Sequence, residues 1–232
     1  MGDPVEAVLF DWGGTLTPWH TVDVEEELAA LVAAATDAPR DAAALLRAAG
    51  DAVWARSREQ HVSARLDDIF AEAGLAYDAS LLTAYREFWE PHTITDPDVL
   101  PLFSRLAVDG IRIGVLSNTV WPRDWHEEFF DRDGVLELVD GAVYTSEVPW
   151  TKPAPEAFHA AMRAVGVADP ARCVFVGDRL FDDIWGAANA GMRTVLVPHS
   201  EIPAHQVGHT EGDPDAVVDR LADVYDVICA WR

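Results

Sequence analysis

The sequence predicts an α/β fold with a parallel sheet, and three observations support this prediction. Four short runs are rich in Val, Ile, Leu and Phe without polar alternation, as the buried strands of parallel sheets are. Helical patterns separate these runs, and one long interval contains only helical periodicity. The predicted strands span residues 5–10, 111–116, 172–176 and 193–197, with a short edge strand at 215–218.

The composition indicates a folded, strongly acidic protein. The chain has 232 residues, of which 40 are acidic and 17 basic, so its formal net charge is −23. This charge offers no cationic surface to nucleic acid or to anionic lipid, and no apolar run approaches the roughly 20 residues that span a bilayer. The N-terminus lacks the cationic-then-apolar pattern of a signal peptide. We therefore expect no nucleic-acid or membrane partner and a cytoplasmic location.

The interval between the first two strands predicts a bundle of four helices. Asp23 and Glu26 form a capping-box pattern at the start of the first helix. A second helix is centred on residues 45–54, and a third ends at Gly74. The fourth begins near Asp78 and stops before a proline.

The helical bundle defines a second predicted domain. We expect residues 17–96 to form a helical cap, and residues 1–16 and 97–232 to form the core. Because the cap follows the first strand directly, it would cover the carboxyl end of the sheet, where a lid belongs. The sequence does not define an oligomeric state.

Polar residues follow the first three predicted strands, at Asp11, Ser117 and Asp178. Shortly after Asp11 come Gly13 and Gly14, where the backbone can approach a ligand closely. Ligands of open α/β sheets bind beyond the carboxyl ends of the strands, so we expect one shared crevice. Each segment alone also fits a structural role, as a turn or a strand–loop transition.

Two further segments carry charges suited to a phosphate and a metal ion. Lys152 is the single lysine beside 16 arginines, and it precedes a proline-flanked helix start. An ammonium fixed there could neutralise both a carboxylate and a phosphoryl group, although chance in an arginine-rich chain is the alternative. Asp182 and Asp183 either cap a helix or join Asp178 in holding a hard cation, most simply Mg²⁺.

In their order and spacing, these segments resemble the motifs of the haloacid dehalogenase-like hydrolase superfamily. The chain also contains the runs KPAPEAF and VGDRLFDDIWGAANAGM, which are close to the family's forms. The resemblance covers nearly the whole chain and includes a helical cap after the first motif. The four motifs are Asp11 to Thr15, Ser117, Lys152, and Asp178 with Asp183.

The resemblance implies a Rossmann-like core and a Mg²⁺-dependent phosphatase acting on a small phosphorylated metabolite. Asp11 would attack phosphorus and form an aspartyl-phosphate intermediate. The transferring group would be held by Ser117, Asn118 and Lys152. The Mg²⁺ ligands would be Asp11, the backbone carbonyl of Gly13, Asp178 and Asp183, with Asp182 as a second candidate for the last position.

Gly13 departs from the family pattern. Family phosphatases carry a second Asp at this position, which protonates the leaving group and then activates water. General acid–base groups typically contribute about 10²–10⁴-fold, so fast hydrolysis needs a substitute or a good leaving group. His20 and His126 have suitable chemistry, although each also fits an ordinary loop histidine.

Two other function classes stay open. The run DWGGT looks like the DWAGT form of phosphonoacetaldehyde hydrolases, but those enzymes need a cap lysine, which residues 17–96 lack. Haloacid dehalogenases also replace the second Asp but work without metal, which the retained Asp178 and Asp183 argue against. A non-catalytic phosphometabolite-binding protein is the remaining interpretation.

Six tryptophans flank the motif segments. They predict either an apolar lining of the substrate pocket or packing between cap and core. These residues are Trp12, Trp19, Trp121, Trp125, Trp150 and Trp185.

Overall fold

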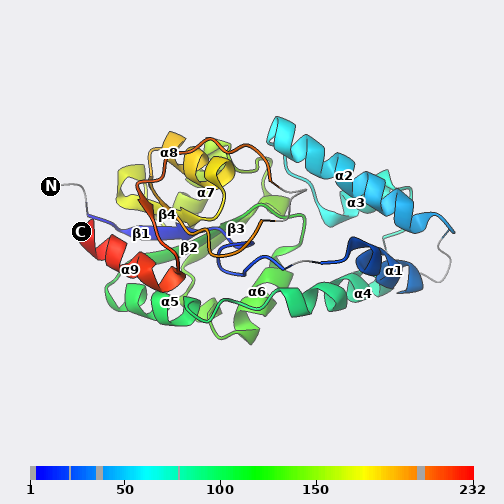
Figure 1. Cartoon of the computed structure of the whole chain (residues 1–232), viewed down its shortest axis with the longest axis horizontal. Coiled ribbons are helices and arrows are strands. Elements are labelled where there is room, and N and C mark those ends of the chain that lie inside the picture. Colours follow the sequence, from blue (N-terminus) through cyan, green and yellow to red (C-terminus); the bar gives the residue numbers. More distant parts are fainter. Residues whose placement is uncertain (1–3, 21, 35–38, 78, 203–206) are drawn as a thin grey trace.

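The computed structural model has a six-stranded parallel sheet at one end and a helical insertion at the other (Figure 1). The structure describes residues 4–20, 22–34, 39–77, 79–202 and 207–232. The strand order is β3-β2-β1-β4-β5-β6. β1 therefore lies in the interior of the sheet, with β2 and β3 on one side of it and β4, β5 and β6 on the other. The predicted α/β class is confirmed.

The elements have the following bounds. The strands are β1 (Ala7–Phe10), β2 (Arg112–Ser117), β3 (Gly141–Tyr144), β4 (Cys173–Gly177), β5 (Arg193–Leu196) and β6 (Ala216–Val217). The helices of the insertion are α1 (Val24–Ala34), α2 (Ala42–Gln60), α3 (Leu66–Glu72) and α4 (Ala79–Trp89). The α-helices of the core are α5 (Val99–Val108), α6 (Arg123–Arg132), α7 (Pro155–Ala164), α8 (Gly186–Asn189) and α9 (Leu221–Ala230).

The predicted strands and the helical character of the insertion agree with this structure. Asp78, near which the fourth helix is expected to begin, lies outside the described residues. The strand β3 was not predicted. It pairs only with β2, and of its four residues only Val143 and Tyr144 are buried, so it lacks the continuous apolar run of the central strands.

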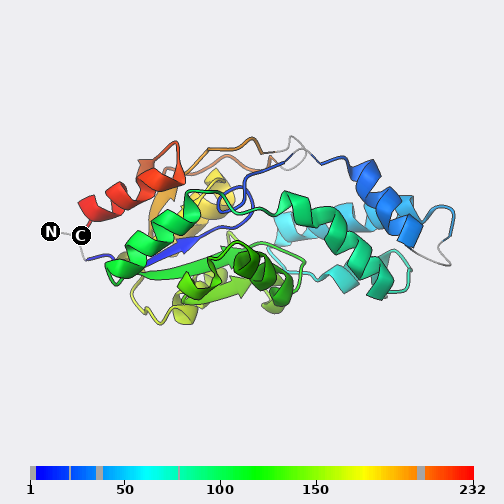
Figure 2. The same cartoon turned by 90° about the horizontal axis from the view of Figure 1, so that it is seen from below.

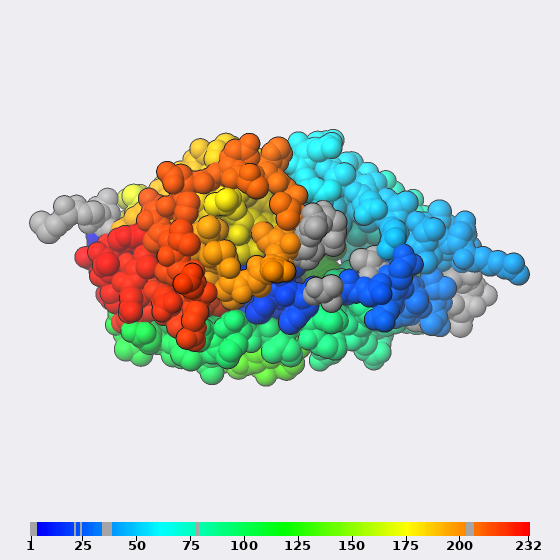
Figure 3. Space-filling view, in the orientation of Figure 1, coloured from blue at the N-terminus to red at the C-terminus, as the bar shows by residue number. Residues whose placement is uncertain are grey.

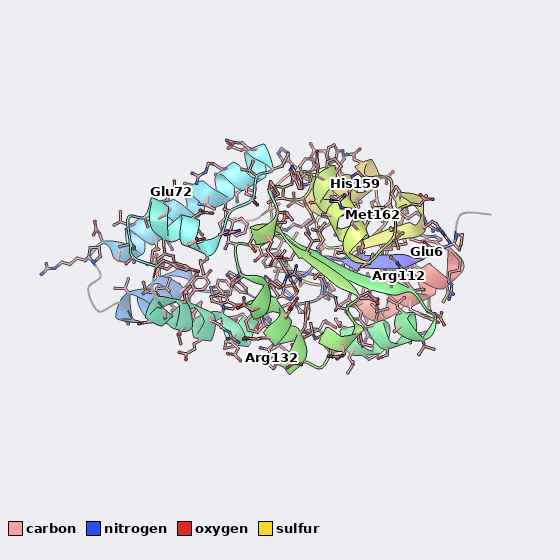
Figure 4. All side chains as sticks on the ribbon, turned by 180° about the vertical axis from the view of Figure 1, so that it is seen from behind. Glu6, Glu72, Arg112, Arg132, His159 and Met162 are labelled. Atoms are coloured by element: carbon pink, nitrogen blue, oxygen red, sulfur yellow. The ribbon has the colours of Figure 1, made fainter. Side chains whose placement is uncertain are left out.

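Helices cover both faces of the sheet (Figures 1 and 2). On one face α7 packs against β1, β2 and β3, with Met162 buried and His159 on its outer side (Figure 4). On the other face α5 contacts β2 and α9. Arg112 ties α7 to the sheet, because its Nη1 donates to the carbonyls of Val165 at 2.6 Å and Gly166 at 2.8 Å. This contact lies at the amino end of β2, opposite the strand end at Ser117.

The helical insertion forms the far end of an elongated molecule (Figure 3). Within it α1 packs against α2 and α4, and α2 against α3. One continuous cluster of buried apolar side chains extends from the insertion to the sheet. The returning chain is held by Arg132 of α6, whose Nη2 donates to the Thr93 carbonyl at 2.8 Å (Figure 4). Among the described residues, no helix combines the length and the apolar character needed to cross a membrane.

Candidate active site

The register of the sheet brings three predicted site residues to one edge. Phe10 is level with Val115 and Val176. Asp11 therefore follows β1 at nearly the height at which Ser117 ends β2 and Asp178 follows β4. All three side chains are buried. The three strand ends that were expected to share a site thus lie side by side in the sheet.

Lys152 connects two of the carboxylates at this edge. Its Nζ lies 2.5 Å from Asp11 Oδ1 and 2.6 Å from Asp183 Oδ1. Carboxylate oxygens of Asp11, Asp178 and Asp183 lie within 4.8 Å of one another. Asp11 and Lys152 thus meet in one buried ion-pair network, although more than a hundred residues separate them in the sequence.

Two glycines make room for these carboxylates. A Cβ at Gly177 would lie 2.4 Å from Asp183 Cγ, so only a glycine lets Asp183 approach the end of β4. Gly14 has a φ of 93°, and a Cβ there would lie 2.3 Å from Asp178 Oδ2. Gly13 differs, since the nearest atom to its Cβ position is Trp19 Cη2 at 3.9 Å. Gly14 and Gly177 are therefore fixed by packing, whereas Gly13 is not.

A π-helical turn, Leu180–Trp185, presents Asp183 to the site. From the sequence, Asp182 or Asp183 would cap an ordinary helix here. Instead, both Asp183 and Ile184 donate their backbone N–H to the Arg179 carbonyl at 3.2 Å, which widens the turn. Asp183 Oδ2 in return accepts the Arg179 N–H at 2.9 Å. Of the two candidate aspartates, Asp183 joins the cluster with Asp11 and Asp178, and Asp182 does not.

Asn118 contacts the segment that carries Lys152. Its Oδ1 accepts the Lys152 N–H at 2.8 Å, and its Nδ2 donates to the Lys152 carbonyl at 3.1 Å. The side chain is therefore occupied by the backbone of Lys152. A phosphate contact from Asn118 would have to use its backbone N–H.

Burial sets the electrostatics of the cluster. Burial raises the pKa of Asp11 to about 6, against the opposing effect of Lys152. Burial, with the charges of Asp11 and Asp183, raises the pKa of Asp178 to about 8. Burial also lowers the pKa of Lys152, but the carboxylates of Asp11 and Asp183 outweigh it and hold that pKa above its ordinary value. The ammonium is therefore charged, and the carboxylates repel one another.

The cluster fits a divalent cation. When ionised, Asp11, Asp178 and Asp183 carry three negative charges. The Lys152 ammonium contacts two of these groups and Arg179 adds a more distant positive charge, so the ionised cluster keeps an excess of negative charge. Buried charges without a counter-charge are costly, and hard divalent ions prefer carboxylate oxygens. Asp178 Oδ1 is buried and has no hydrogen-bond partner among the described residues. The charge and this unpaired oxygen both match a divalent ion.

Comparison with known proteins places this site in a family. The family model of haloacid dehalogenase-like hydrolases matches residues 5–191, a span that contains every residue of the cluster. The chain belongs to this family. It is therefore a hydrolase, and the resemblance described from the sequence is confirmed.

Individual relatives of this hydrolase are phosphatases. A glyceraldehyde 3-phosphate phosphatase of Methanopyrus kandleri is 28% identical over 97% of each chain. The Pyrococcus furiosus enzyme of the same name is 35% identical over 66% of this chain and 59% of its own. Two solved structures share the fold. A phosphatase of this family from Thermococcus onnurineus has a TM-score of 0.64 at 22% identity, covering 97% of this chain and 98% of its own. L-2-haloacid dehalogenase from Xanthobacter autotrophicus has a TM-score of 0.66 at 20% identity, covering 98% of this chain and 100% of its own.

The two histidine candidates of the hydrolase lie apart from the cluster contacts. His126 is 0% exposed and stacks on Tyr144 with the ring centroids 4.5 Å apart. Burial lowers the pKa of His126 to about 3, so the ring is neutral, and its Nε2 pairs with Thr119 Oγ1 at 3.1 Å. His20 is exposed, with His92 as its ring neighbour. His126 is a core residue, and neither contact set links a histidine to Asp11.

Three of the six tryptophans pack between the insertion and the core. Trp121 is surrounded by Trp12, Tyr85 and Trp89 at centroid distances of 5.6 to 6.1 Å, and Trp125 lies 5.9 Å from it. Trp150 and Trp185 are partly exposed. Trp19 alone among the six hydrogen-bonds to the acidic cluster, through Asp178. The packing interpretation therefore holds for Trp12, Trp121 and Trp125.

The loop between α2 and α3 contacts the Lys152 segment directly. Val62 pairs with Trp150 in an antiparallel bridge. Thr151 N donates to the His61 carbonyl at 3.0 Å, and Ser63 N to the Pro149 carbonyl at 3.2 Å. We call residues 61–63 with 149–151 the insertion latch. No pattern in the sequence marked this pairing, because it depends on backbone groups.

Proposed function

We propose that this hydrolase is a Mg²⁺-dependent phosphatase that acts on a small phosphorylated metabolite through Asp11. The observation that carries the proposal is the buried cluster of Asp11, Asp178 and Asp183 with Lys152 bridging two of them. A site whose ionised carboxylates outnumber the neighbouring cations suits a divalent ion and its phosphate ligand better than a metal-free reaction. The phosphatase names of the relatives support the same class.

Asp11 is the proposed nucleophile. One carboxylate oxygen forms a bond to phosphorus as the ester P–O bond breaks in line, and the leaving oxygen takes a proton. Water then attacks the phosphorus, the bond to Asp11 breaks, and inorganic phosphate leaves. Lys152 orients the Asp11 carboxylate before attack and neutralises charge on the phosphoryl oxygens. The Ser117 hydroxyl and the Asn118 N–H hold those oxygens at the end of β2.

Mg²⁺, when bound, would be held by Asp11, Asp178, Asp183 and the carbonyl of Gly13, and would offset charge on the transferring group. The helical insertion, residues 17–96, is proposed to be a cap that excludes water. The insertion latch supports this role, because it joins the insertion to the loop that precedes Lys152.

Gly13 shapes the proposed substrate preference. It supplies no acid to the leaving oxygen, and His126 is buried and neutral in the core. In the proposed reaction that oxygen takes its proton from water. Esters with acidic leaving groups therefore react fastest. Across a series of aryl phosphates, the rate should fall steeply as the pKa of the leaving phenol rises.

The deciding experiment measures phosphate release by the metal-stripped protein with and without Mg²⁺. p-Nitrophenyl phosphate and glyceraldehyde 3-phosphate, the substrate named for two relatives, are the first compounds to test. Release that needs Mg²⁺ and is abolished by Asp11→Asn supports the proposal. Halide release from a 2-haloacid without metal would assign the dehalogenase reaction instead. Phosphate-ester binding without turnover would make the protein a binding protein.

A further inference from the structure

Trp19 lies in a segment that is fixed on both sides. Its backbone N–H donates to Ser200 Oγ at 3.1 Å, and the same hydroxyl donates to the Gly14 carbonyl at 3.2 Å. Ser200 therefore joins the Trp19 segment to the glycine turn after β1. The Trp19 side chain is half-buried.

The indole of Trp19 binds the carboxylate of Asp178. Its Nε1–H donates to Asp178 Oδ2 at 2.7 Å, a short hydrogen bond that is charge-assisted when Asp178 is ionised. The other oxygen, Oδ1, is the buried atom without a partner among the described residues. Fixing Oδ2 thus sets the direction in which Oδ1 points.

The surroundings leave room for this contact and little else. A Cβ at Gly14 would lie 2.1 Å from Trp19 Nε1, so the glycine is needed for the indole to reach Asp178. The guanidinium of Arg179 lies 5.1 Å from the centre of the Trp19 ring, a distance typical of a cation–π contact. Arg179 also donates its backbone N–H to Asp183, so one residue supports both the indole and a second carboxylate.

The chemistry of the donor matters. An indole N–H is neutral and donates a single hydrogen bond. It can hold a carboxylate without cancelling the negative charge that attracts a cation, whereas Lys or Arg in the same place would compete with that cation.

We propose that Trp19 is a positioning residue that orients Asp178 toward a divalent cation. This inference rests on the proposed cation site at Asp11, Asp178 and Asp183, and it adds a residue that no motif of the sequence assigns to that site. Ring and N–H are separable in experiment, because Trp19→Phe keeps an aromatic ring and loses the donor. Trp19→His keeps a ring with an N–H.

The test measures Mg²⁺ binding to the full-length, metal-stripped protein by isothermal titration calorimetry. A hydrogen bond to a charged group contributes enough for a loss of about tenfold to a hundredfold in affinity. We expect this loss in Trp19→Phe and a smaller loss in Trp19→His. Trp231→Phe is the matched control, since Trp231 is also half-buried beneath an arginine, with Arg193 5.2 Å from its ring. It should bind Mg²⁺ as the wild type does.

Activity provides a separate readout. At Mg²⁺ concentrations that saturate the variant, kcat of Trp19→Phe should return to within about threefold of the wild type, with an unchanged KM for substrate. Circular dichroism and cooperative melting confirm that each variant is folded. If Trp19→Phe does not fold, Trp19→His decides, because it should retain measurable but weakened Mg²⁺ binding.

Each outcome decides a defined point. Wild-type affinity in both Trp19→Phe and Trp19→His would overturn the inference, and so would the absence of Mg²⁺ binding by the wild type. Weakened binding in Trp19→Phe supports it even if no phosphate ester is hydrolysed, in which case the proposed function alone fails. Phosphatase activity with unchanged affinity in the variant refutes the role of Trp19 and leaves the proposed function standing.

Discussion

The side chain of Asn118 pairs with both backbone polar groups of Lys152, accepting its N–H at 2.8 Å and donating to its carbonyl at 3.1 Å. Asn118 follows Ser117 at the end of β2, and Lys152 lies between β3 and α7. The pairing therefore fixes the ammonium relative to the strand end, and explains how a residue in a loop can meet two carboxylates at once.

Asn118→Asp tests this pairing. The substituted carboxylate still accepts the Lys152 N–H but repels its carbonyl, so Lys152 should shift from Asp11. We expect kcat to fall about 10- to 100-fold, because small displacements of catalytic groups have effects of this size. The kcat of Asn118→Ala, which loses both hydrogen bonds, should fall by at least as much. An unchanged kcat in both variants would show that Lys152 is positioned without Asn118.

Gly13 and Gly14 provide a second test because their environments differ. The Cβ position of Gly13 meets no atom nearer than 3.9 Å, whereas that of Gly14 would lie 2.1 Å from Trp19 Nε1 at a φ of 93°. Gly13→Asp should therefore fold and raise kcat on alkyl phosphates, by up to about 10²–10⁴-fold if proton transfer limits the rate. Gly14→Ala should lose stability and activity. Unchanged turnover in a folded Gly13→Asp variant would indicate that a proton donor is not what the site lacks.

The sequence predicted this site where short-range rules govern it. Asp11, Ser117 and Asp178 follow buried strands, and parallel strands end at one edge, so their proximity could be expected without coordinates. Asp183 was placed ahead of Asp182 only through the resemblance to a family, because the π-helical turn that presents Asp183 and is held by Arg179 has no local signature. The contact from Trp19 to Asp178 spans 159 positions and has no local signature. The strand β3 was missed because an edge strand with two buried residues lacks the apolar run of a central one.

The raised pKa of Asp178 predicts a pH-dependent response to Mg²⁺. Asp11 and Asp178 titrate as a pair, with pKa values of about 6 and about 8 in the metal-free protein. A carboxyl group whose pKa is higher in the folded than in the unfolded state destabilises the fold as pH rises from about 4 toward 8. Mg²⁺ needs the ionised form, so its affinity should increase with pH, about tenfold per unit for one displaced proton, and level off near pH 8.

Thermal melting with and without Mg²⁺ checks this dependence. The increase in Tm on adding Mg²⁺ should be larger at pH 8.5 than at pH 6, since stabilisation by a ligand grows with its affinity. Asp178→Asn serves as the control, and should show a small Mg²⁺ effect with little dependence on pH. An equal Mg²⁺ effect in the wild type at both pH values would mean that ion binding displaces no proton from the pair.

The insertion latch supplies the last prediction. Ser63→Pro removes the N–H that donates to the Pro149 carbonyl at 3.2 Å, while the preceding Val62 already has the extended pairing that a residue before proline favours. Loss of one backbone hydrogen bond should lower the free energy of unfolding by about 1 kcal/mol. The assay temperature is one at which both proteins are fully folded, so the lower stability alone leaves kcat unchanged. If the latch also positions the Lys152 segment, kcat of Ser63→Pro should fall at this temperature.

Ser63→Ala is the control, because it keeps the N–H and should match the wild type in both kcat and Tm. A Ser63→Pro variant with lowered Tm and full kcat would assign the latch to stability alone, because Lys152 would then hold its position through Asn118, Asp11 and Asp183.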